Sequence, residues 1–124
     1  MKERMLKLLP AAANDDGEFN FAARMWDADV IFVSGADAVR VAVRDGRVGD
    51  VAAVAADTAA PVRVSGPPEG WKKMLMPQPP PFYQDLFGAA VHHGFRIEGK
   101  VEEVFPYYPA LRRLIELLRD GDGP

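Results

Sequence analysis

The stretch AVRVAVRDGRV, residues 38–48, predicts an antiparallel sheet. Three valines alternate with arginine or alanine along residues 39–44, which is the period of a strand with one buried face. Asp45-Gly46 follows directly, and a glycine there supplies the positive φ that a tight hairpin turn requires. The stretch therefore predicts two antiparallel strands joined by a two-residue turn.

The flanking segments extend this pattern in both directions. Strands are predicted along residues 18–54, including the continuous apolar run DADVIFVSG at 27–35, and again in APVRVSG at 60–66. The first nine residues predict a short helix that ends before Pro10, and AAANDDGE at 11–18 predicts a loop. Residues 1–27 are therefore interpreted as a leader, a short helix plus loop, ahead of the main domain.

After residue 66 the pattern takes on the period of a helix. PPEGWKKMLM at 67–76 and FYQDLFGAAVHHG at 82–94 predict helices, and PQPPP at 77–81 predicts a stiff, extended connector between them. FRIEGKVEEVF at 95–105 predicts a strand, and YYPALRRLIELLRDG at 107–121 predicts the final helix, with an apolar stripe from Leu111 to Leu118.

This order of elements predicts an α+β domain. We expect a mostly antiparallel sheet of about five strands, covered on one face by helices, over residues 28–119. The last five residues, DGDGP at 120–124, predict a flexible tail.

Composition narrows the classes of function. The chain has 124 residues, 15 Lys and Arg against 18 Asp and Glu, and no cysteine. A net charge of −3 argues against nucleic acid as the main partner. Without cysteine there is no disulfide, thiolate nucleophile or cysteine metal site. No apolar run is long enough to span a membrane, and no signal peptide is recognised, so we expect a cytoplasmic protein.

The two histidines are interpreted as structural. His92 and His93 are adjacent near the end of a predicted helix, so they point about 100° apart and cannot chelate one metal ion together. Ser34 and Ser65 lack the glycines on both sides that a nucleophile elbow needs. We therefore predict no catalytic residue, no metal ion and no cofactor.

Large apolar side chains concentrate in the second half of the chain. They come from short predicted helices and from the segments around the proline-rich connector. Most are expected to be core, because a small domain needs such anchors. Methionines and aromatics on short helices against a sheet are also typical of the wall of a hydrophobic pocket. Both interpretations stay open at this point.

One stretch resembles a known family. GFRIEGKVEEVFPYYPALRRLIELL, residues 94–118, is similar to the closing segment of the sterol-carrier-protein (SCP2-like) family, in which a glycine-flanked strand leads into a leucine-rich terminal helix. The matching strand positions are Gly94, Phe95, Ile97 and Gly99. Upstream, PVRVSGPPEGWKKMLM at 61–76 resembles the family's strand that leads into a helix of the pocket.

The resemblance implies a function. Members of the family bind lipids, sterols or fatty acyl chains in an apolar tunnel, perform no covalent chemistry, and often serve as accessory domains of enzymes. We therefore expect a non-catalytic binding domain, with the proline-rich connector as a cover. The pocket wall is predicted to consist of Trp71, Met74, Leu75, Phe82, Phe87, Phe95, Leu114 and Leu118.

Two alternatives remain. One is an interaction domain or accessory enzyme subunit, whose exposed aromatics, including Tyr107 and Tyr108, contact a second copy or an enzyme partner. The other is a small enzyme of the ketosteroid-isomerase type that uses an Asp and a His. That fold usually ends in strands, whereas this chain ends in its clearest helix, so the order of elements disfavours it.

Overall fold

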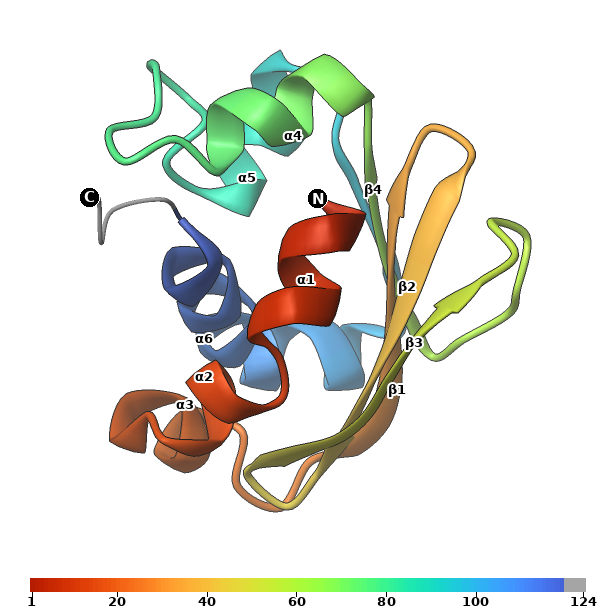
Figure 1. The fold of residues 1–124 in the computed structure, drawn as a ribbon, viewed down its shortest axis with the longest axis vertical. Helices are drawn as coiled ribbons and strands as arrows, with labels where there is room; N and C mark the ends of the chain where they lie inside the picture. The colour runs from red at the N-terminus through yellow and green to blue at the C-terminus, as the bar shows by residue number, and fades with distance from the viewer. Residues whose placement is uncertain (120–124) are drawn as a thin grey trace.

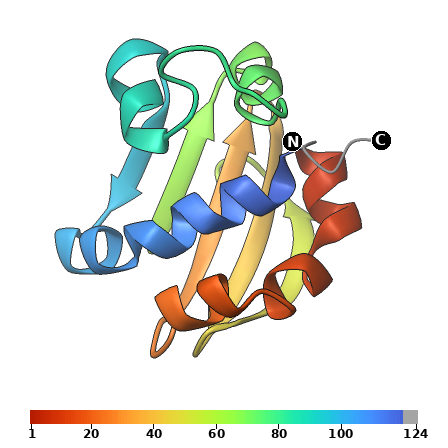
Figure 2. The same cartoon turned by 90° about the vertical axis from the view of Figure 1, so that its left-hand side faces the viewer.

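The structure, a computed structural model, describes residues 1–119, and the tail predicted at 120–124 lies outside them. A single sheet carries all the helices of this range on one side (Figures 1 and 2). The strands are β1 Asp27–Ser34, β2 Asp37–Arg44, β3 Arg47–Val54, β4 Val62–Gly66 and β5 Arg96–Gly99. The helices are α1 Lys2–Leu8, α2 Ala11–Asn14, α3 Gly17–Ala22, α4 Pro68–Met74, α5 Leu86–His92 and α6 Val101–Leu118.

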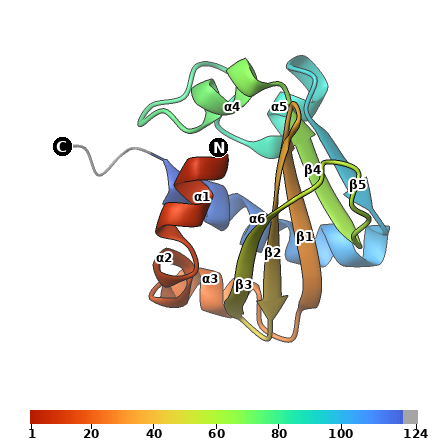
Figure 3. The same ribbon diagram turned by 45° about the vertical axis from the view of Figure 1, so that its right-hand side comes forward.

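The sheet has five strands in the order β3-β2-β1-β4-β5, and every neighbouring pair is antiparallel except β1 with β4. Asp45 and Gly46 form the turn between β2 and β3, both with positive φ. The predicted hairpin and the α+β class are therefore confirmed. The parallel pair arises because the chain returns from β3 to β4 across the sheet face without helices (Figure 3).

The two faces of the sheet are buried by different means. On the helix side, alternate residues of β1, β2 and β4 enter one hydrophobic core together with residues of all six helices. On the other side Ile31, Val33 and Ala38 form a small cluster beneath the segment 55–61. The Arg63 guanidinium fixes that segment by donating hydrogen bonds to the carbonyls of Ala56, at 2.8 Å, and Thr58.

The first 27 residues match the prediction only in the helix before Pro10, which is α1. The loop expected at 11–18 contains α2 and the start of α3, and the strand pattern expected from residue 18 begins only at Asp27. Asp16 caps α3 by accepting a hydrogen bond from the Phe19 N–H at 2.8 Å. Phe19 and Ala23, four residues apart, are both buried in the main core. Helices this short are stable only through such packing, which sequence periodicity does not reveal.

The boundary between the last strand and the last helix also differs. The strand predicted at 95–105 stops at Gly99, and α6 starts at Val101, so residues 101–105 are helical. Pro106 and Pro109 lie inside α6 on its exposed side, and each removes one N–H from the backbone bonding of the helix. The predicted stripe is confirmed: Leu111, Leu114, Ile115 and Leu118 are buried.

An ion pair joins the start of α3 to α6. Arg113 of α6 donates two hydrogen bonds to the Asp16 carboxylate, from Nη2 to Oδ1 at 2.8 Å and from Nε to Oδ2 at 3.0 Å. Glu18 and Glu116 lie 3.6 and 3.2 Å from the same guanidinium. The hydrogen bond from Arg113 holds the pKa of Asp16 below its ordinary value.

We expect Asp16→Asn to lower the free energy of unfolding by about 1–3 kcal/mol near neutral pH, because asparagine keeps the cap but loses the charge pair. Since folding lowers the Asp16 pKa, the pair stabilises the fold above the unfolded pKa of about 3.9 and is lost as the pH falls through the folded pKa. The wild-type and variant stabilities should therefore converge in acid. Urea unfolding across this pH range measures the difference, and a gap that persists in acid would contradict the assignment.

Candidate ligand-binding pocket

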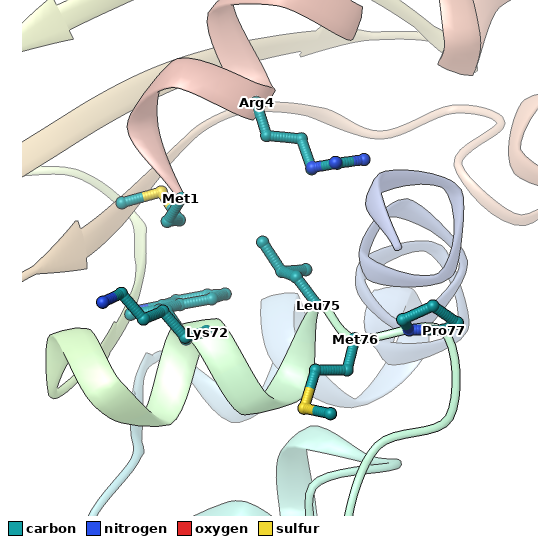
Figure 4. A pocket seen from close by; sticks show the side chains of 7 residues that line it. Met1, Arg4, Lys72, Leu75, Met76 and Pro77 are labelled. Carbon is teal, nitrogen blue, oxygen red and sulfur yellow. The ribbon is translucent and has the colours of Figure 1, made fainter. Parts of the chain in front are cut away.

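A pocket of about 270 Å³ opens between the N-terminal helix and the end of α4. Met1 and Arg4 line it from the α1 side, and Lys72, Leu75, Met76 and Pro77 face them from α4 and the connector (Figure 4). Trp71 completes the lining. The volume lies just below the roughly 300–1,000 Å³ typical of small-molecule sites.

The lining combines apolar side chains with a basic margin. Met1, Trp71, Leu75, Met76 and Pro77 provide the apolar surface. The charged lining residues are Arg4 and Lys72, and no acid belongs to the lining. Arg4 Nη1 also donates to the Leu118 carbonyl at 3.1 Å, which ties α1 to the end of α6. An apolar body with an acidic or strongly hydrogen-bond-accepting end would match such a surface.

The predicted wall residues fall into two groups. Six of them belong to one buried cluster: Trp71, Met74, Leu75, Phe95, Leu114 and Leu118. Of these, Trp71 and Leu75 line the pocket, and the other four lie in the core. Phe82 and Phe87 lie elsewhere, with 50% and 40% of their surface exposed. The structure thus brings the larger group together and leaves two aromatics at the surface.

Trp71 is fixed from three directions. Its Nε1–H donates to the Val33 carbonyl of β1 at 2.8 Å, and its ring meets Phe32 and Phe95 edge-on at centroid distances of 6.2 and 5.1 Å. Phe95 in turn lies against Gly66 of β4 and Gly70 of α4. The side of the pocket that belongs to α4 is therefore rigidly attached to the sheet.

Phe82 is not helical, contrary to the prediction that placed it in the helix now seen as α5. It has a φ of +67° and lies in the connector, because α5 begins only at Leu86. Its ring stacks on His92 at 3.9 Å, and Tyr83 stacks on His93 at 3.9 Å with the planes 6° apart. Both histidines thus contact connector aromatics. Within residues 1–119, no group of three or more His, Cys, Asp or Glu side chains is placed to hold a metal ion.

A second surface cluster includes Phe87. Its ring stacks on Tyr108 at 4.2 Å and lies 6.4 Å from Phe105, which is 62% exposed. The Tyr108 hydroxyl donates to Asp85 and accepts from the Phe87 N–H. We call Phe87, Phe105 and Tyr108 the α5–α6 aromatic cluster.

Sequence reasoning missed part of the lining, namely Met1, Arg4, Lys72, Met76 and Pro77. Met1 and Arg4 gave no local signal, because they meet residues about seventy positions away only through the tertiary fold. Lys72 and Met76 adjoin predicted wall residues in sequence, so the neighbourhood of Trp71 and Leu75 was the available signal.

In the part of the chain that the structure describes, no helix is long and apolar enough to cross a membrane.

No protein-family model and no curated protein sequence matches the chain. Solved structures do. Sterol carrier protein 2 aligns with a TM-score of 0.73 and 16% identity, covering 88% of each chain. A conserved hypothetical protein of Thermus thermophilus, titled as a candidate sterol carrier protein, aligns with a TM-score of 0.68 and 18% identity over 89% of this chain and 80% of that one.

A third structure, titled UbiJ-SCP2 ubiquinone synthesis protein, aligns with a TM-score of 0.58 and 16% identity over 93% of this chain and 90% of that one. Identities this low establish the fold alone. That fold is not the one on which the ketosteroid-isomerase alternative rested. The chain has the SCP2-like fold, as the resemblance in residues 61–76 and 94–118 implied.

Proposed function

We propose that this protein binds the apolar part of a lipid, fatty acyl compound or sterol without catalysing a reaction, as a carrier or accessory domain. The observation that carries the proposal is the pocket at the α4–connector junction, built on an SCP2-like fold and lined mainly by apolar side chains. Burial of each methylene in such a site contributes about 0.8 kcal/mol, so affinity requires no reactive group. A cytoplasmic location is part of the proposal.

In this proposal the apolar chain of the ligand enters beside Trp71 and Leu75 and extends toward Met74 and Leu118. These four residues belong to the same buried cluster. Phe95 and Leu114, the other predicted wall residues in that cluster, form its far side, whereas Phe82 and Phe87 belong to the outer surface. A pocket of about 270 Å³ holds only part of a long chain, so the interior side chains must move to admit the rest. Met74 suits this role, because an unbranched thioether adapts its shape readily.

The basic margin favours a ligand with an anionic end. Lys72 lies at the entrance, and its ammonium is shared with Glu69 at 3.4 Å in an exposed pair that contributes little by itself. We expect Lys72→Gln to weaken binding of a fatty acid about two- to fivefold, with no effect on the alcohol of the same chain length, since an exposed charge contact contributes less than about 1 kcal/mol. Equal losses for acid and alcohol would contradict the assignment.

Displacement of a fluorescent fatty acid tests the pocket itself. Met76 is 44% exposed and lines the pocket, so Met76→Glu places a carboxylate at the entrance with little effect on the fold. We expect about a tenfold loss of affinity, because burying an acyl chain beside that charge costs roughly 1–2 kcal/mol. Val91→Glu is the matched control: Val91 is 78% exposed on α5, outside the lining. Failure of acyl chains and sterols alike to bind the wild type would refute the proposal.

A second candidate is an accessory role in a protein complex. The α5–α6 aromatic cluster favours it, since Phe105 and Phe87 expose large apolar surfaces side by side. The partner would be a second copy or an enzyme. Sedimentation velocity of the wild type and Phe105→Ser separates the two, because only self-association would shift with this variant in the absence of other proteins.

A further inference from the structure

We propose that Arg119 is a positioning residue of the pocket, which holds the connector 76–84 in place over the entrance and so sets the rate of ligand exchange. The inference concerns regulation of the pocket described above, and in its kinetic part it rests on the proposed function. Its structural part concerns the connector alone and can be measured without any ligand.

The connector cannot hold itself in place by regular backbone bonding. Four of the nine residues in MPQPPPFYQ are prolines, which lack an N–H and favour a stiff extended conformation. Met76 N–H donates to the Lys73 carbonyl at 3.3 Å, and Tyr83 N–H donates to the Pro80 carbonyl at 3.0 Å. Such a segment has many carbonyl acceptors and few N–H donors. A side chain with several donors can therefore fix it.

Arg119 supplies those donors at both ends of the connector. Its Nε donates to the Met74 carbonyl at 3.0 Å, just before the connector begins. Its Nη2 donates to the carbonyls of Gln84, at 2.8 Å, and Tyr83, at 3.3 Å, where the connector ends. One planar guanidinium therefore closes the connector into a loop. Burial lowers the pKa of Arg119, in agreement with a cation taken partly out of water to serve this role.

Stacking on α5 supports the same position. His93 lies flat against Tyr83 and its Nε2 is 3.1 Å from the Pro81 carbonyl, while His92 lies against Phe82. Lys73 covers Tyr83 at 5.7 Å. These contacts give the two adjacent histidines a physical role: they hold the end of the connector against α5.

The same turn of α6 reaches the opposite side of the pocket. The Leu118 carbonyl accepts a hydrogen bond from Arg4, which lines the pocket from α1, while the next residue, Arg119, holds the connector that carries Met76 and Pro77. The end of α6 thus connects both sides of the entrance. Release of Arg119 frees the connector and leaves the α1 side attached.

Hydrogen–deuterium exchange of the ligand-free protein tests the structural part. In Arg119→Ala we expect the amides of Met76 and Tyr83, the two connector amides that donate backbone hydrogen bonds, to exchange about tenfold faster or more, because the charge-assisted hydrogen bonds that hold this segment are lost. Amides in β1 and β2 should be unchanged. The exchange rates in Arg119→Lys should lie between those of the wild type and Arg119→Ala, since an ammonium keeps the charge but cannot bridge both ends of the connector. Arg112→Ala, on the exposed side of α6, is the matched control.

Stopped-flow transfer of cis-parinaric acid to phosphatidylcholine vesicles tests the kinetic part. We expect Arg119→Ala to raise the dissociation and association rates together, each about tenfold, so that the Kd changes much less than either rate. His93→Ala should act in the same direction and keeps the experiment decisive if Arg119→Ala does not fold. A merely structural role of Arg119 would alter stability without this paired change in rates.

The outcomes separate the two proposals. If the probe binds and neither the rates nor the connector amides respond to Arg119→Ala and His93→Ala, the role of Arg119 is refuted and the pocket stands. If no probe binds any variant but the connector amides exchange faster, the proposed function fails and Arg119 retains its structural role.

Discussion

Trp71→Ala is expected to lower the free energy of unfolding by about 3–5 kcal/mol, the range for removal of a fully buried aromatic ring. Trp71 is 1% exposed, and it links α4 to β1 through its bond to the Val33 carbonyl and its contacts with Phe32 and Phe95. Because small domains have only about 5–15 kcal/mol in total, this is a large fraction of their stability. Urea unfolding followed by far-UV circular dichroism measures the effect.

Trp71→Phe separates the ring from its hydrogen bond. Phenylalanine retains most of the packing but cannot donate to Val33, so a loss of about 1–3 kcal/mol is expected. A change below about 0.5 kcal/mol for Trp71→Ala would show that the ring does not secure α4. The result also bears on binding experiments: loss of ligand by Trp71→Ala would report a damaged core, which is why Met76→Glu is the better test of the pocket.

Phe95→Ala is expected to lower the free energy of unfolding by a similar amount, about 3–5 kcal/mol. It should also reverse the sign of the stability effect of Gly70→Ala. A Cβ on Gly70 would lie 2.7 Å from Cε1 of Phe95, and one on Gly66 would lie 2.5 Å from Cε2. Phe95 is 2% exposed and cannot retreat, because Trp71 lies against it. The two glycines therefore exist in this fold to make room for one ring.

Gly70→Ala sets a gain in helix propensity against a clash with the Phe95 ring. Within a helix such as α4, this change alone would stabilise by about 1 kcal/mol through helix propensity. Overpacking against Phe95 costs about 1–3 kcal/mol, so in the wild type we expect net destabilisation. In the Phe95→Ala background the clash with the ring is gone, only the 3.2 Å approach to Pro67 Cγ remains, and the sign should invert. A double-mutant cycle from urea unfolding measures this coupling, and additive effects would contradict it.

The order of the main elements could be read from local patterns. The alternation along residues 39–44, the Asp45-Gly46 turn and the apolar stripe of residues 111–118 each depend on side-chain period or backbone preference within a few residues. Errors arose where a local pattern was overruled. Residues 17–22 are helical because Asp16 caps α3 and Phe19 packs into the core, and residues 101–105 join α6 although their pattern also suits a strand.

For the pocket, too, local sequence predicted one part and missed another. Its predicted wall was found from apolar residues on short helices, and Trp71 and Leu75 do line the entrance. The local sequence did not distinguish Met74, which is core, from Leu75 beside it, nor reveal that Phe82 would stack on a histidine outside that core. Side-chain type predicts burial well, but whether a buried residue borders a space depends on what lies opposite.

The sequence by itself determined the α+β class, the hairpin, the apolar helices and the absence of cysteine chemistry, because these follow from composition and from periods of two or 3.6 residues. Only the tertiary structure decided that residues 11–22 form two further helices over the sheet, that Arg4 faces Leu75, and that Arg119 fixes both ends of the connector. Those contacts join residues far apart in the chain, and no local pattern records which distant groups folding brings within hydrogen-bond distance.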